Sequence, residues 1–351
     1  MFALILLAFN QINFNSLRDV ANYSSIFVVT LATYLAYFHI KKLNFTFFAG
    51  VNLVWLLVGM VQTYIYPYFL TFLLNGGGRG IDSESRGVTS LATEPGMYGL
   101  ITLLLLGIAI INYPLKKIWW IIVLLIFQLL LLAQSATALL TLVVAFGGFL
   151  TVKLLMFNRR AVVYGLAVMI LGVVTFNLTY ETLKEQRIYQ LGAELTENPK
   201  LFLAADGSVS ERFMFVYYSF KGMVDNNFLP RGYNKFNDYM QAEFVKPRGE
   251  FTSLLLSFTR DDYTRILCGL GSVFFQLGIF GIGIPLGIVA CFRRRLFEDK
   301  FLFVCILIFS ILLTAFALMT ATLGLILGSA LYLSRQPDET TNPLITANQP
   351  L

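Results

Sequence analysis

The chain has 351 residues, of which 57% are hydrophobic and 13% are charged. Soluble domains carry about 25% charged residues, so this composition excludes an ordinary soluble protein and indicates a polytopic membrane protein. The net charge of +6 does not indicate a nucleic-acid partner, because the clustered lysines and arginines fall in short connections between apolar segments, and the 11 basic residues of 181–265 are mixed with 12 acidic ones.

Several long segments contain no Asp, Glu, Lys or Arg. They are 20–40, 43–78, 95–115, 118–152, 161–180, 266–292 and 301–334. One crossing needs roughly 20 residues, so 118–152 and 301–334 are expected to hold two crossings each. We therefore predict an all-α polytopic membrane protein with about nine to ten transmembrane helices in a single domain, 1–335. Whether Met1–Phe14 crosses the membrane stays open, and the polar segment 336–351 is expected to be a disordered cytoplasmic tail.

Basic residues occupy every second connection between these segments. They are Lys41–Lys42, Lys116–Lys117, Lys153 with Arg159–Arg160, and Arg293–Arg295. The positive-inside rule assigns these connections to the cytoplasm. The two large polar loops, 74–94 and 181–265, are therefore expected to face outward, together with the turn near Gln134.

The first outward loop carries Arg79 and Arg86 and ends at Glu94-Pro95. Proline suits the first turn of a helix, so the next helix is expected to begin at Pro95. Glu94 would then lie at a helix N-terminus, where its negative charge is favoured. That placement is compatible with a functional role as well.

A short polar stretch, Gln134–Thr137, interrupts the segment 118–152 on the same outward side. Ser135 and its neighbours are expected either to cap and pack a helix or to contact substrate.

The second outward loop, 181–265, is too long to be a mere connection, so a functional role or a lid is expected. Helical composition is found at 180–189, and Ser210–Met223 has apolar residues at helical spacing, which predicts a helix lying on the mouth of the bundle. The stretch Pro230–Tyr233 is typical of a turn.

The outward polar residues favour an anion site. Arginine presents a planar fork of donors that suits diphosphate oxygens. Both loops place a glycine ten positions after an arginine, Arg86 to Gly96 and Arg212 to Gly222. The alternative is that each arginine pairs with a nearby acid, Glu84 or Glu211. A further alternative, a metal site, would use the acids Asp82, Glu84, Asp261 and Asp262, although hard cations need more oxygen ligands than such pairs supply.

Several motifs, taken in order, resemble the bacterial O-antigen polymerase (Wzy-type) and O-antigen ligase superfamily of membrane glycosyltransferases. These motifs are Arg86 with Glu94–Tyr98, Gln134–Leu140, Ser210–Arg212, Leu229–Tyr233 and Gln276–Gly281. The resemblance implies a GT-C-like fold in the bacterial inner membrane with its active face in the periplasm. The family's arginine-to-glycine pattern has ten intervening residues, whereas both spacings here have nine. The ligase branch uses a histidine in its large loop, and this sequence has none between Tyr180 and Arg265, which favours a polymerase.

The resemblance implies transfer of a glycan from one undecaprenyl-diphosphate carrier to the non-reducing end of another lipid-linked unit. We expect no cofactor and no metal, because the donor arrives already activated. Implied partners are undecaprenyl-diphosphate-linked oligosaccharides, the lipid bilayer, and a chain-length regulator or flippase of a polysaccharide assembly complex. Ligase-like transfer, lipid-linked oligosaccharide export, and a non-enzymatic role in the assembly complex stay open as alternatives.

Site residues follow from these expectations. Arg86 and Arg212 are expected to hold the diphosphate, and Glu94 or Glu211 to orient or deprotonate the acceptor hydroxyl. Further substrate contacts are expected from Arg79, Arg231, Arg248, Glu250, Tyr98 and Ser135.

Overall fold

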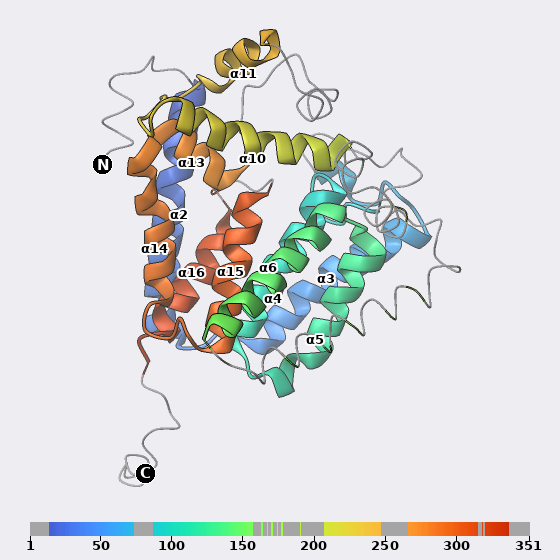
Figure 1. The fold of residues 1–351 in the computed structure, drawn as a ribbon. Helices are drawn as coiled ribbons and strands as arrows, with labels where there is room; N and C mark the ends of the chain where they lie inside the picture. The colour runs from blue at the N-terminus through green and yellow to red at the C-terminus, as the bar shows by residue number, and fades with distance from the viewer. Residues whose placement is uncertain are drawn as a thin grey trace.

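A computed structural model describes most of the chain. The described residues are 14–73, 87–156, 207–246, 266–314 and 320–336, with the single positions 163, 167, 170, 174, 177, 190 and 318. Within them every regular element is a helix (Figure 1). The expected helix at 180–189, the expected crossing at 161–180 except for single helical positions, and the tail beyond Gln336 lie outside the described residues.

Six helical segments of the described chain are long and apolar enough to cross a membrane. They are α2 (Phe14–Ile40), α3 (Phe45–Tyr64), α4 (Pro95–Asn112), α5 (Leu115–Phe127) continued by the π-helical turn η2 (Gln128–Ala133), α6 (Ala136–Leu155), and α13 (Gly269–Leu277) continued through η3 (Gly278–Ile282) into α14 (Gly283–Phe292). The prediction of an α-helical polytopic membrane protein is thereby confirmed. The predicted break of 118–152 is confirmed too, because α5 with η2 ends at Ala133 and α6 begins at Ala136.

Helix α4 is the centre of the bundle, with 83% of its residues buried. It packs against α5, α6, α15 (Asp299–Leu313) and α16 (Ala321–Leu333). Close packing also joins α16 to α2, where a Cβ added at Gly324 or Gly328 would clash with Val29 or Thr33. Small residues four apart let two membrane helices approach closely, so these glycines position α16 along α2.

The basic connections gather at one end of the bundle, which we call the basic end. Lys117 lies over the Phe45 ring at 4.5 Å, and Lys153 forms an ion pair with Asp299. At the same end the Ser334 hydroxyl donates to the Cys291 carbonyl at 3.2 Å. The connections that carry the basic residues are far apart in the sequence but lie at the same end of the bundle. The predicted topology requires this arrangement.

The apolar segment 301–334 differs from expectation. Its two helices, α15 and α16, have 15 and 13 residues; α15 starts at the basic end and α16 ends there. At 1.5 Å per residue they are about 22 and 20 Å long, shorter than the roughly 30 Å of a bilayer core. The end of α15 and the start of α16 therefore lie below α10 (Figure 1).

Two helices of the second loop cover the opposite end. Helix α10 (Gly207–Asp225) lies across the ends of the spans, and α11 (Phe236–Val245) lies above it (Figure 1). The helix predicted at Ser210–Met223 is confirmed. It is fixed by an aromatic core in which Phe215 stacks on Phe236, and Phe236 meets Phe275 of α13 edge-on. We call this the α10 end.

Candidate functional site

Three segments far apart in the sequence meet at the α10 end. The Arg212 guanidinium donates to the Thr137 hydroxyl through Nη1 and lies 3.4 Å from the Glu94 carboxylate through Nη2. Glu94 ends the first outward loop, Thr137 lies in the first turn of α6, and Arg212 lies on α10. The Arg212 side chain is 11% exposed and that of Glu94 is 40% exposed, so the acid reaches solvent while the cation is largely enclosed.

Local sequence determines how α4 and α6 begin here. Glu94 has extended backbone and makes no capping bond with its side chain, and Pro95 occupies the first turn of α4, where a proline costs no hydrogen bond. Ser135 caps α6, since its Oγ accepts a hydrogen bond from a backbone N–H three residues further on at 3.2 Å. Gly99 brings the two helix starts together, because a Cβ there would lie 2.7 Å from that of Ser135. Two helix N-termini therefore lie beside Arg212 and add positive potential.

The two glycines that follow an arginine by ten positions each lie beside another arginine. A Cβ on Gly96 would lie 2.5 Å from Nη2 of Arg212. The Gly222 carbonyl accepts a hydrogen bond from Nε of Arg231 at 2.6 Å, and a Cβ on Gly222 would lie 2.5 Å from the Phe275 ring. The repeated spacing thus marks two places where a guanidinium approaches a helix backbone.

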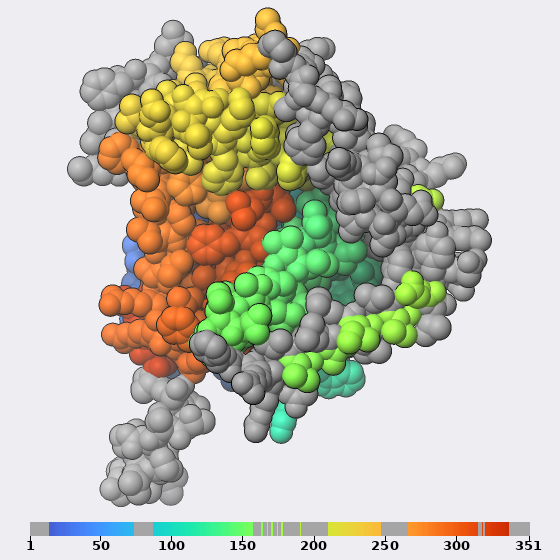
Figure 2. Space-filling model, in the orientation of Figure 1, coloured from blue at the N-terminus to red at the C-terminus, as the bar shows by residue number. Residues whose placement is uncertain are grey.

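An apolar groove of about 250 Å³ starts at Arg212 and runs between α6, α10 and α15. Its lining consists of Thr137, Leu140, Thr141, Val144, Arg212, Phe213, Val216, Ser310, Leu313 and Thr314. The C-terminal end of α15 lines the groove with Leu313 and Thr314. On the face drawn in Figure 2 the surface is recessed beneath α10, between α14 and α6. Arg212 is the one charged residue among the described residues of this lining, and it lies at the α10 end of the groove.

Helix α10 is apolar on two faces. One stripe, Phe213, Val216, Tyr217 and Phe220, has the apolar spacing that predicted this helix, and it lines the groove and a neighbouring depression along α10. Packing against α11 and α13 is instead made mainly by the adjacent stripe of Met214, Phe215 and Tyr218. The helix was predicted correctly, but the face that holds it in place is largely the other one.

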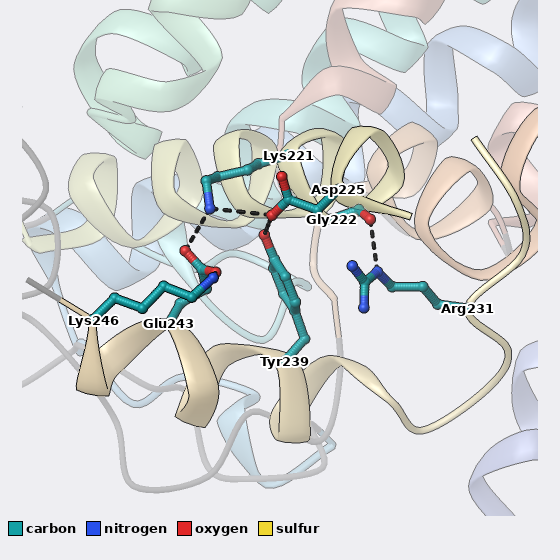
Figure 3. A network of polar contacts seen from close by, with 7 residues as sticks. All are labelled: Lys221, Gly222, Asp225, Arg231, Tyr239, Glu243 and Lys246. Atoms are coloured by element: carbon teal, nitrogen blue, oxygen red, sulfur yellow. Dashed lines mark hydrogen bonds and ion pairs between the residues drawn. The ribbon is translucent and has the colours of Figure 1, made fainter. Parts of the chain in front are cut away.

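A second polar cluster joins α10 to α11 (Figure 3). Lys221 contacts Glu243 at 2.5 Å and Asp225 at 3.2 Å, and the Tyr239 hydroxyl donates to Asp225 at 2.8 Å. Lys246 completes the group through a hydrogen bond to Glu243. Two lysines and two carboxylates compensate one another in this cluster.

Two opposing effects set the pKa values of the charged groups in this cluster, namely burial and pairing with opposite charges. Burial alone favours the neutral forms, but the hydrogen bonds and opposite charges hold the pKa of Asp225 and of Glu243 below their ordinary values. The same contacts outweigh burial at Lys221 and raise its pKa. Burial, and then the bond to Asp225, raise the pKa of Tyr239, so its hydroxyl stays a donor.

Two motifs of the resemblance contact each other through their backbones. The N–H groups of Arg231 and Gly232 donate to the carbonyls of Phe275 and Gln276 at 3.3 and 3.1 Å. Gly278 has a φ of +56°, and a side chain there would collide with the backbone at Phe228. The segments Leu229–Tyr233 and Gln276–Gly281 therefore form one unit that connects the second loop to α13.

The remaining predicted residues occupy different places. Tyr98 is fully buried, where its hydroxyl donates to Gln128 at 2.9 Å and its ring stacks on Trp55 at 5.8 Å, so it lies inside the bundle and not among the residues that line the groove. Ser135 is buried and caps α6, and Glu211 is half-buried next to Arg212 on α10. Outside the described residues lie Arg79, Arg86, Arg248, Glu250, Asp82, Glu84, Asp261 and Asp262.

Some polar residues with structural contacts were not among the site residues expected from the sequence. Thr137 holds Arg212, although the prediction chose Ser135 from the same polar stretch. Asp19 of α2 accepts a hydrogen bond from Gln276 at 2.7 Å, and Tyr23 donates to the same glutamine. Asp19 precedes the apolar segment 20–40 by one residue, which is the only sequence signal that it belongs to the membrane helix.

These observations define an α-helical polytopic membrane protein with a guanidinium at the end of an apolar groove. Comparisons of the chain with protein-family models, with curated proteins and with solved structures return no match. The resemblance to O-antigen polymerases therefore stays a prediction.

Proposed function

We propose that the protein is a membrane glycosyltransferase that polymerises undecaprenyl-diphosphate-linked oligosaccharides. The observation that carries this proposal is the position of Arg212, whose guanidinium lies at the head of an apolar groove between α6, α10 and α15. An amphiphile with an anionic head and a hydrocarbon chain fits such a groove, because the chain matches the apolar lining and the head meets the cation.

The charges around Arg212 support an anionic head group. The starts of α4 and α6 add their positive ends to the guanidinium, and such helix N-termini favour phosphate. Thr137 and Glu94 hold the guanidinium in place, so it is positioned before the ligand arrives. Pre-positioned donors of this kind stabilise charge that develops during a reaction.

The reaction uses these groups as follows. An acceptor hydroxyl attacks the anomeric carbon of the donor glycan, a new glycosidic C–O bond forms, and the bond from that carbon to the diphosphate oxygen breaks. Negative charge develops on the departing undecaprenyl diphosphate, where Arg212 stabilises it; such a group is worth about 10²–10³ in rate. The hydroxyl proton passes to a base, and the base in this proposal is Glu94, whose carboxylate lies 3.4 Å from Arg212 and also reaches solvent.

The proposal places the α10 end at the outer face of a bacterial cytoplasmic membrane. Its support is the gathering of Lys117, Lys153 and the neighbouring connections at the basic end. Partners in this proposal are lipid-linked oligosaccharides and the other members of a polysaccharide assembly complex.

The test is turnover by the purified full-length chain in liposomes that contain a defined undecaprenyl-diphosphate oligosaccharide. The wild type should extend the glycan and release undecaprenyl diphosphate, and Arg212→Ala should lower the rate about 10²–10³-fold. Arg294→Ala, which changes an exposed arginine at the basic end, serves as the matched control and should keep the wild-type rate.

Two results contradict the proposal. One is glycan movement across the membrane with no new glycosidic bond, which would indicate an exporter. The other is equal turnover by Arg212→Ala and Arg294→Ala.

A further inference from the structure

A second arginine, Arg231, is held rigidly at the outer surface. Its Nε donates to the Gly222 carbonyl at 2.6 Å, and its guanidinium lies over the Tyr239 ring at 4.6 Å and over the Phe275 ring at 5.7 Å. Gly222 makes this approach possible, because a Cβ there would meet the Phe275 and Tyr239 rings at 2.5 and 3.2 Å. The guanidinium is therefore fixed in plane and position before any ligand binds (Figure 3).

The terminal nitrogens of Arg231 have no hydrogen-bond or ion-pair partner among the described residues. The four charges next to it, on Lys221, Asp225, Glu243 and Lys246, are already paired with one another. One positive charge is thus left over at this end of the cluster.

Arg231 also lines an open depression of about 410 Å³. Around it the depression presents Asn226, Lys235, Asp238 and Tyr239, and Lys235 is balanced by Asp238 at 3.7 Å. An amide, an ion pair and a tyrosine around one unpaired guanidinium offer donors, acceptors and a ring edge. These groups suit a hydroxyl-rich ligand that carries a carboxylate better than a lipid chain, because most of the residues that line the depression are polar.

We propose that this depression binds a carboxylate-bearing sugar of the glycan, with the two terminal nitrogens of Arg231 gripping the carboxylate end-on. That the ligand is a sugar rests on the function proposed above. This geometry follows because Nε of Arg231 already donates to the Gly222 carbonyl. The two terminal nitrogens are left to make the parallel hydrogen bonds that arginine forms with carboxylates. Along α10, ten residues separate Arg212 from Gly222, or about 15 Å, so the two sites lie several sugar units apart.

Binding is measured on the purified full-length chain in detergent by saturation-transfer NMR, with trigalacturonate and its fully methyl-esterified form as probes. The ester keeps the sugar skeleton and removes the charge. Trigalacturonate should bind the wild type at least tenfold more tightly than the ester, and Arg231→Gln should abolish that preference. Arg294→Gln, the same change at an exposed arginine of the basic end, should keep it.

A second variant guards against loss of folding. Lys235→Glu changes an exposed side chain and adds a negative charge to the depression, so it should weaken trigalacturonate binding more than ester binding. Equal binding of acid and ester to the wild type, or the same preference in Arg231→Gln and Arg294→Gln, would overturn the inference.

The outcome is separable from that of the proposed function. Loss of turnover in Arg212→Ala together with absent trigalacturonate binding in the wild type overturns the sugar site alone. Normal turnover in Arg212→Ala together with Arg231-dependent trigalacturonate binding overturns the transferase alone.

Discussion

Replacing Gly96 by alanine should damage catalysis while leaving the fold intact. The new Cβ would lie 2.5 Å from Nη2 of Arg212, whereas ordinary contacts begin at about 3.4 Å, so the guanidinium has to move by roughly 1 Å. The clash falls on the far end of a flexible side chain, which can move without disturbing the helices. Alanine also favours the first turn of α4 by up to about 1 kcal/mol relative to glycine.

A displacement of this size matters because the proposed catalysis depends on where the Arg212 guanidinium lies. Misplacing a catalytic group by about 1 Å can cost on the order of 10²-fold in rate. We therefore expect Gly96→Ala to lower turnover in the liposome assay by about 10–100-fold, with an unchanged or slightly raised unfolding temperature.

The matched control is Gly147→Ala on α6, where an added Cβ meets no atom within 4 Å. That variant should keep the wild-type rate, and its unfolding temperature should equal or exceed that of the wild type. Equal turnover by Gly96→Ala and Gly147→Ala would refute the reasoning, as would a loss of turnover in Gly96→Ala that is accompanied by unfolding.

Three further predictions concern the same end of the molecule. Gly222→Ala should lower stability by about 1–3 kcal/mol, measured by thermal unfolding, because its Cβ would strike the packed Phe275 ring and not a movable side-chain tip; an unchanged unfolding temperature would contradict this. Glu94→Gln should lower turnover, since a general base contributes about 10²–10⁴ in rate, and equal turnover by wild type and variant would exclude that role. Asp225 and Glu243 have depressed pKa values, so their contribution to docking of α11 is complete above pH of about 4 and is lost as the pH falls through the depressed values. Hydrogen exchange in α11 should therefore show constant protection from pH 5 upward and a loss of protection in acid, and protection that persists in acid would contradict the pairing.

Local signals in the sequence predicted much of the architecture. Pro95 places the start of α4, the polar stretch Gln134–Thr137 separates α5 with η2 from α6, and helical spacing predicts α10. Each of these depends on neighbouring residues only, so it is readable without knowledge of the fold.

Contacts between distant segments could not be predicted in the same way. The partner of Arg212 is Thr137 and not the neighbouring Ser135, a choice that depends on how α6 is rotated against α10. The apolar segment 301–334 gives no sign that α15 stops at Leu313, yet the end of that helix lines the groove. Both apolar stripes of α10 have helical spacing, so the sequence does not tell which one packs.

The most direct test of the central claim is a binding measurement on the purified protein with undecaprenyl diphosphate and with uncharged undecaprenol. Both ligands share the chain, so the difference in affinity isolates the contribution of the diphosphate. Hydrogen bonds to charged groups contribute about 1.5–3 kcal/mol, so the wild type should prefer the diphosphate by roughly 10–100-fold, and Arg212→Ala should remove most of that preference. A preference of the same size in wild type and Arg212→Ala would contradict the claim that this guanidinium holds the diphosphate.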